Sequence, residues 1–300
     1  MKRRSFLKHA VLTAGLVGAP MLTPACTSVP LRPVPGPGVD KLLRQGARVM
    51  WVAAHPDDES MTGGILARAS LTYNNPLFFL IFTHGDGGEC CRPEGCLPDL
   101  ATVRGEEMAD AAKLYHAELQ HERLFNAKLP VESFPKRHEI GKLWKKEKDP
   151  ELLAAEAIRR FRPDVLFTFD PFHGFTGHPE HQLASRFATS GVRLAASGDP
   201  LNSGLPPHRV GHVYYILNKY WPFALFGAQD PGAVNETWDA RQLCINGYKC
   251  RDIMARFTRI HRTQENDMNM VRTLVGIFDK VYLRKTDPFE EILDPYEPVS

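Results

Sequence analysis

Two short stretches combine histidines with carboxylates in a pattern that favours metal-assisted hydrolysis. Residues 55–59 read His-Pro-Asp-Asp-Glu and follow an apolar run directly. Three acids and a histidine at the edge of a core are costly unless a cation or hydrogen-bond donors compensate them. A histidine beside a carboxylate is a usual half-site for zinc. The alternative is that Asp57 or Asp58 caps the following helix, which explains one acid and leaves His55 without a role.

The second stretch, residues 177–181, reads Gly-His-Pro-Glu-His. His178 and His181 are three residues apart, so on a helix they share a face and both imidazoles can point into one cleft. A single histidine here would more often be a surface or capping residue. Two histidines at this spacing, placed after a strand, favour a site that the first stretch could share.

Apolar runs and amphipathic stretches alternate along the chain and would position these side chains. The predicted strands are residues 47–54, 76–83, 163–169 and 212–217. The predicted helices are residues 60–71, 99–116, 151–161, 178–196 and most of 248–277. This alternation predicts an α/β fold, a mostly parallel, doubly wound sheet in a single domain. Ligands bind at the carboxyl ends of strands in such sheets, where both stretches fall.

The two stretches resemble the motifs of the PIG-L/LmbE family of zinc-dependent de-N-acetylases. The resemblance spans about residues 48–188 and includes a Thr-x-Gly-Asp motif ending at Asp86 and an Arg-x-x-Glu motif from Arg104 to Glu107. It implies a Rossmann-like sheet with helices on both faces and removal of acetyl groups from N-acetylglucosamine on varied carriers. The chain departs from the family at Glu180, where the family usually has aspartate.

Carried over by position, the resemblance implies that His55, Asp58 and His181 bind zinc and leave one coordination position for water. Asp57 would be the general base, and afterwards the acid for the departing amine. His178 would donate a hydrogen bond to the negative charge that develops on the substrate carbonyl.

Three further residues receive weaker assignments from the same resemblance. Asp86 and Arg104 would contact the sugar. Asp170, at the end of a predicted strand, would orient His178 or one of the ligand histidines. The alternatives are a metal-dependent hydrolase of another amide, an ester or a lactone, and a non-catalytic exported lipoprotein that binds sugars.

The first 26 residues resemble a twin-arginine export signal. A basic stretch containing Arg3 and Arg4 precedes a short apolar run, and Cys26 ends a segment similar to a lipoprotein cleavage site. Residues 27–40 are rich in proline and glycine, which predicts a linker, and residues 41–300 would form the catalytic domain. We therefore expect an exported, periplasmic or envelope protein, with lipidation of Cys26 and cleavage without lipidation both open.

Composition sets limits on the other partners. The 300 residues are 43% hydrophobic and 24% charged with a formal net charge of +2, which indicates a globular protein and gives no indication of nucleic-acid binding. Besides Cys26 there are five cysteines, and in an oxidising compartment we expect a disulfide inside the loop from Cys90 to Cys96. The disulfide pattern of Cys90, Cys91, Cys96, Cys244 and Cys250 and the oligomeric state are not predicted.

Overall fold

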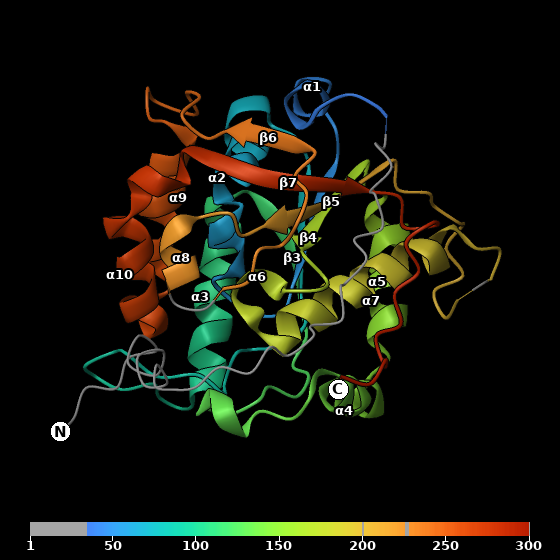
Figure 1. The fold of residues 1–300 in the computed structure, drawn as a ribbon, viewed down its shortest axis with the longest axis horizontal. Coiled ribbons are helices and arrows are strands. Elements are labelled where there is room, and N and C mark those ends of the chain that lie inside the picture. Colours follow the sequence, from blue (N-terminus) through green and yellow to red (C-terminus); the bar gives the residue numbers. More distant parts are fainter. Residues whose placement is uncertain (1–34, 200, 226–227, 300) are drawn as a thin grey trace, which may run out of the picture.

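The computed structural model describes residues 35–199, 201–225 and 228–299 (Figure 1). The predicted export signal and most of the predicted linker lie outside these residues, so export and lipidation stay predictions. The last residues of the predicted linker contact the domain, because Lys285 Nζ donates to the Pro35 carbonyl at 2.8 Å. Among the described helices, none combines the length and apolarity needed to cross a membrane.

A seven-stranded sheet with the order β3-β2-β1-β4-β5-β7-β6 forms the centre of the molecule. The first five strands in this order are parallel, and β7 runs antiparallel to both β5 and β6. The strands are β1 (Val49–Ala53), β2 (Leu77–Ile81), β3 (Ala117–His121), β4 (Val165–Phe169), β5 (His212–Leu217), β6 (Glu236–Asp239) and β7 (Lys280–Thr286). The predicted α/β fold with a mostly parallel sheet is confirmed.

Strands β1 and β2 are apolar at every position because both faces of the sheet are covered. In β1, Val49 and Trp51 point into one core cluster, whereas Met50 and Val52 point into the other. This is the period of two expected for a strand, with neither side facing solvent. The continuous apolar runs of the sequence therefore correspond to strands between two layers of helices.

The helices form one layer on each face of the sheet (Figure 1). One core cluster is built from α1 (Val39–Arg44), α2 (Gly63–Ala67), α3 (Leu100–Leu114), α9 (Cys250–Phe257) and α10 (Glu265–Thr273). The other is built from α4 (Arg137–Glu147), α5 (Pro150–Phe161) and α7 (Pro179–Ala196). Two short helices, α6 (Gly174–Gly177) and α8 (Trp221–Leu225), follow β4 and β5 along the chain.

The sheet order brings the two histidine-containing stretches together. β1 pairs in parallel with β2 on one side and with β4 on the other. The segment that follows β1 therefore lies between the carboxyl end of β2, where the Gly85 loop begins, and that of β4, which is followed by Asp170. Such a switch point, where successive connections go to opposite sides of the sheet, is the usual ligand site of a doubly wound fold.

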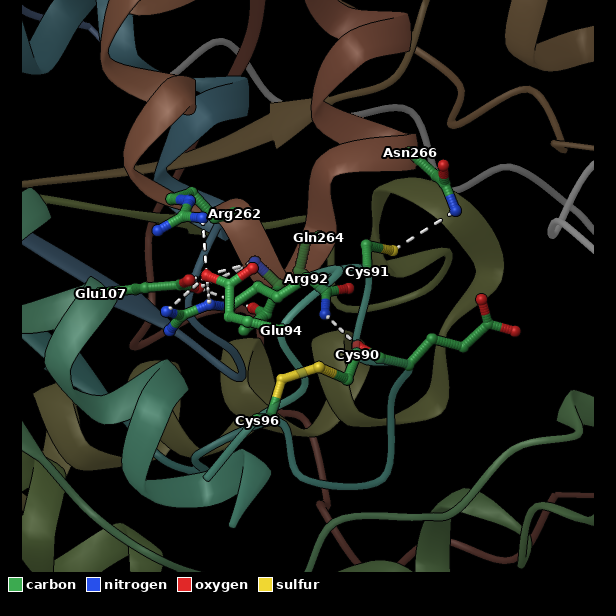
Figure 2. Close-up of a disulfide and its surroundings, with 11 residues drawn as sticks. Cys90, Cys91, Arg92, Glu94, Cys96, Glu107, Arg262, Gln264 and Asn266 are labelled. Carbon is green, nitrogen blue, oxygen red and sulfur yellow. Dashed lines mark hydrogen bonds and ion pairs between the residues drawn. A yellow bond between two sulfur atoms is a disulfide. The ribbon is translucent and has the colours of Figure 1, made fainter. Parts of the chain in front are cut away.

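A disulfide-closed loop lies beside the C-terminal helices. Cys90 is bonded to Cys96, which places a disulfide in the loop where one was expected and determines its partners, and Cys91, Cys244 and Cys250 are free thiols among the described cysteines. Figure 2 shows the loop against the segment that precedes α10. The Cys91 amide donates to the Thr263 carbonyl at 3.0 Å, and Arg262 pairs with Glu94 at 2.7 Å. These contacts fasten the loop to a part of the chain about 170 residues away in sequence.

Candidate active site

Three acceptor atoms converge at the carboxyl ends of β1 and β4. His55 Nδ1 lies 3.0 Å from His181 Nε2, and Asp58 Oδ1 lies 3.0 Å from the same nitrogen. All three residues are less than a tenth exposed. Atoms this close and buried need a shared proton or a cation between them, because three lone pairs facing one another repel.

The outward hydrogen bonds of the two imidazoles fix which nitrogen faces the cluster. His55 Nε2 is 2.5 Å from Glu180 Oε2, and His181 Nδ1 is 2.8 Å from the Gly174 carbonyl. A carboxylate and a carbonyl only accept, so each of these ring nitrogens carries a proton. The opposite nitrogens, His55 Nδ1 and His181 Nε2, are then available as metal ligands in neutral imidazoles.

Asp58 is held as the carboxylate of this cluster. Its Oδ2 accepts the backbone N–H groups of Ala54 and His55, at 3.1 and 2.9 Å. Burial alone would raise the pKa of Asp58, but the charge and hydrogen bond of His181 outweigh it and lower the pKa. The capping alternative is not realised at Asp57 either: it occupies the N-cap position of the 3-10 helix Asp58–Met61, but its side chain caps nothing.

His178 lies against the cluster with a different hydrogen-bond pattern. Its ring centroid is 4.8 Å from those of both His55 and His181, and a metal could be held by the three histidines on distance alone. However, His178 Nδ1 accepts the Glu180 backbone N–H at 3.2 Å, as the N-cap of α7. A neutral ring then carries its proton on Nε2, which makes that nitrogen a donor and not a ligand. Burial lowers the pKa of His178 well below its ordinary value, which favours this neutral form.

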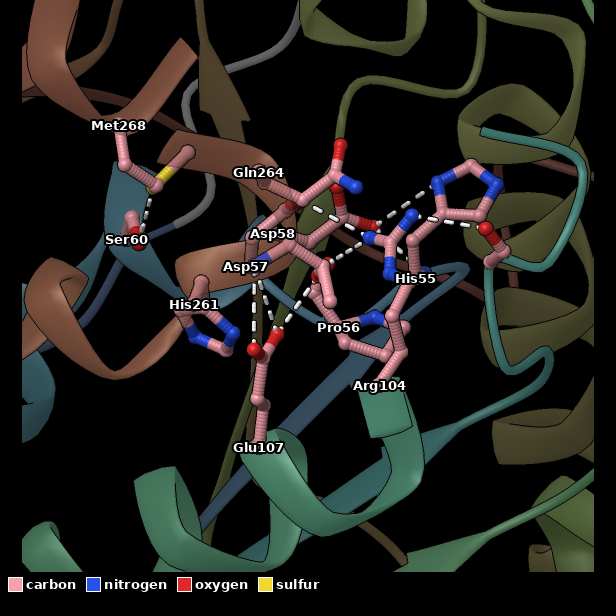
Figure 3. Close-up of polar contacts among 12 residues, drawn as sticks. His55, Pro56, Asp57, Asp58, Ser60, Arg104, Glu107, His261, Gln264 and Met268 are labelled. Carbon is pink, nitrogen blue, oxygen red and sulfur yellow. Dashed lines mark hydrogen bonds and ion pairs between the residues drawn. The ribbon is translucent and has the colours of Figure 1, made fainter. Parts of the chain in front are cut away.

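Asp57 lies beside the cluster and is the most accessible of its acids, with an 18% exposed side chain. Arg104 Nη2, from α3, donates to Asp57 Oδ2 at 3.1 Å, as Figure 3 shows. Burial raises the pKa of Asp57 to about 6, although Arg104 opposes that shift. A partly exposed carboxylate with a raised pKa can accept a proton near neutral pH.

The remaining predicted site residues lie around this centre with their own partners. Arg104 is 4% exposed and also donates to the carbonyls of Pro56 and Gly85, at 2.7 and 2.8 Å. Asp86 follows in the same glycine loop and is half-buried. Asp170 is fully buried, and its described partners are His173 and Arg284, not a cluster histidine. The expected bond from Asp170 to His178 or a ligand histidine is thus not formed among the described residues, because His173 and Arg284 occupy its carboxylate. Contacts of Asp86 and Arg104 with the substrate stay predictions.

Glu180 is a residue of the site whose contacts the sequence did not indicate. It is fully buried, and besides His55 it accepts from Asn126 Nδ2 at 2.5 Å and from the Ala127 backbone at 2.7 Å. Its carboxylate therefore fixes the ring orientation of His55. Only its position between two predicted site histidines could have drawn attention to it.

The comparison with known families covers the segment that holds both stretches. Residues 50–192 match the PIG-L family model, described as GlcNAc-PI de-N-acetylase. The matched segment contains His55, Asp58, His178 and His181 and is similar to this family. It is 31% identical over 198 residues to a 1D-myo-inositol 2-acetamido-2-deoxy-alpha-D-glucopyranoside deacetylase of Streptomyces scabiei, an alignment covering 62% of this chain and 58% of that relative. The chain thus spans less than two thirds of the length of this curated relative.

Two solved structures share the fold of this chain. The N,N'-diacetylchitobiose deacetylase from Pyrococcus horikoshii is 18% identical with a TM-score of 0.55, covering 83% of this chain and 92% of that one. The 4-carboxy-2-hydroxymuconate hydratase GalB from Pseudomonas putida KT2440 is 15% identical with the same TM-score, covering 80% and 96%. Since a deacetylase and a hydratase both have this fold, the fold does not determine the reaction.

Proposed function

We propose that this protein is a zinc-dependent hydrolase that removes an acetyl group from the amide nitrogen of an N-acylated amino sugar. The observation that carries the proposal is the convergence of His55 Nδ1, His181 Nε2 and Asp58 Oδ1 beside the free carboxylate edge of Asp57. Two imidazoles and one carboxylate are a donor set that suits zinc in a catalytic site, with room for water or substrate. The deacetylase name of the curated relative supports the choice of bond.

The chain's own residues supply the proton transfers. A zinc ion held there would polarise the amide carbonyl and lower the pKa of water. Asp57 then takes the proton of the attacking water and returns it to the departing amine, since its raised pKa suits both directions. His178 Nε2–H donates to the oxygen that gains negative charge, because its other nitrogen is already engaged by the helix backbone.

The names of two similar deacetylases support a substrate class. Both the deacetylase from Streptomyces scabiei and the one from Pyrococcus horikoshii are named for 2-acetamido or N-acetylated sugars. We extend this to a sugar bearing a 2-acetamido group, with Asp86 as the contact from the glycine loop. Arg104 contributes less directly, because its guanidinium is already bonded to Pro56, Gly85 and Asp57.

Acetate release from a panel of N-acetylated glucosamine glycosides tests this function directly. We expect turnover in the protein as purified with zinc, loss after dialysis against a strong chelator, and recovery on adding one equivalent of zinc. A matched panel of acetate esters and lactones should be turned over more slowly. Faster turnover of esters, or full activity in the chelated protein, would contradict the proposal.

The zinc affinity of a Glu180 variant provides a second test of the proposed metal site. Glu180→Ala should weaken zinc binding by about 10–100-fold, because the His55 ring loses the partner that orients it. The measurement is competition with a chromogenic zinc chelator, with exposed Glu290→Ala as the control. Unchanged affinity in the Glu180 variant would mean that the cluster orients His55 without it.

A further inference from the structure

A buried hydrogen-bonded pair, His261 and Glu59, connects two segments of the domain that are far apart in sequence. His261 Nε2 lies 2.6 Å from Glu59 Oε1, and the two residues are 0% and 1% exposed. They are 202 positions apart in sequence. Burial alone would lower the pKa of His261, but the Glu59 carboxylate outweighs it and raises the pKa. The chemistry proposed above uses neither residue.

The second oxygen of Glu59 reaches the backbone of the proposed general base. Glu59 Oε2 accepts the Asp57 N–H at 3.1 Å. Asp57 has φ = 91° and ψ = −19°, a left-handed conformation that residues other than glycine rarely adopt and that the surroundings must enforce. The hydrogen bond from the Asp57 amide is therefore one of the contacts that keep this backbone in place.

Asp57 is thus held from two sides by groups that are distant in sequence. In the view of Figure 3 it lies between His261 and the guanidinium of Arg104. Arg104 fixes the carboxylate and the Pro56 carbonyl, whereas the Glu59–His261 pair fixes the amide. A general base must be held within a fraction of an ångström of its proton to act efficiently.

His261 reaches this position because the chain departs from helix around it. Its φ and ψ are −82° and 63°, between the 3-10 turns Thr258–Ile260 and Arg262–Gln264. The next residues are anchored to α3, where Glu107 accepts from Thr263 N at 3.0 Å and from Thr263 Oγ1 at 2.6 Å. His261 also lies outside residues 50–192, the segment that matches the family model.

We propose that His261 is a positioning residue for Asp57: it fixes the Glu59 carboxylate, which in turn holds the Asp57 backbone so that its side chain faces the reacting water. This inference rests on the proposed function, in which Asp57 is the base. It assigns a role in turnover to a part of the chain beyond the two histidine-containing stretches.

Two substitutions of His261 separate positioning from simple packing. The amide of His261→Gln can place a donor where Nε2 stands, whereas the shorter His261→Asn cannot. We expect kcat to fall by up to ~10²-fold in His261→Asn, with KM and zinc stoichiometry unchanged, and by clearly less in His261→Gln. His208→Asn, which alters a histidine bonded to the Pro163 carbonyl, serves as the control and should keep full kcat. Equal kcat in His261→Asn and the parent protein would overturn the inference.

Combining the substitution with a change at Asp57 tests whether His261 acts through that residue. His261→Asn should not lower the residual turnover of Asp57→Asn any further, whereas a general structural role would lower it in both backgrounds. Should His261→Asn fail to fold, the isosteric Glu59→Gln takes its place with the same expectations. If Asp57→Asn itself keeps full turnover, the proposed function fails; if only the His261 or Glu59 variants keep it, positioning alone fails.

Discussion

Asp57→Asn is expected to lower turnover of an N-acetylated sugar by about 10²–10⁴-fold while the protein keeps its zinc. The amide oxygen can still accept from Arg104 Nη2, which lies 3.1 Å from Asp57 Oδ2, so the loop should keep its shape. The ligand atoms belong to His55, Asp58 and His181 and are not altered. What the variant lacks is a group that can take a proton from water and deliver it to the amine.

The matched control for this variant is Asp110→Asn, the same chemical change at an exposed carboxylate of α3 that pairs with Lys113. Steady-state kinetics with zinc analysis on each preparation gives kcat per bound zinc. Full turnover in Asp57→Asn would show that another group is the base. Loss of zinc in the same variant would show that the Asp57 charge contributes to metal binding.

The central strands of the sheet and the residues nearest the proposed metal could be predicted from the sequence. Strands buried on both faces are largely apolar, so β1, β2, β4 and β5 are recognisable as short apolar runs. His55 and Asp58 follow β1 closely, and His181 comes after β4. Parallel strands carry their carboxyl ends to one edge. Contact among His55, Asp58 and His181 is a consequence of that rule.

The elements that were not predicted lie at the edges of the sheet or on its surface. β3 is half-buried and its sequence, Ala-Glu-Leu-Gln-His, has no apolar run, while α4 is dominated by lysine and other charged residues. β6 and β7 form an antiparallel edge that local periodicity does not indicate. In each case pairing or packing with distant residues stabilises the element. The local sequence pattern therefore does not predict it.

The same reason explains which site residues were missed. Glu180 acts on His55 across 125 positions, and His261 acts on Glu59 across 202. Neither contact follows from spacing on a helix or strand. The helix predicted over residues 248–277 is interrupted by two 3-10 turns, which bring His261 inward. The apolar pattern of that segment does not indicate the interruption.

The hydrogen-bond directions of the histidines predict which substitution removes the metal. His181→Ala should reduce zinc affinity by more than the ~10–100-fold typical of losing an orienting partner, and turnover should fall to the background rate. The reason is that His181 Nε2 is the atom that both His55 Nδ1 and Asp58 Oδ1 face at 3.0 Å. Zinc content after dialysis, with circular dichroism to verify folding, measures the effect.

His178→Ala is the informative counterpart, because this residue is equally close but has the opposite tautomer. Its Nδ1 accepts the Glu180 N–H, so its Nε2 is a donor, and removing it should leave zinc bound while turnover falls by about 10²–10³-fold. The two alanine variants should therefore separate metal binding from stabilisation of the oxyanion. If His178→Ala lost its zinc and His181→Ala kept it, the ligand set would have to be redrawn around His178.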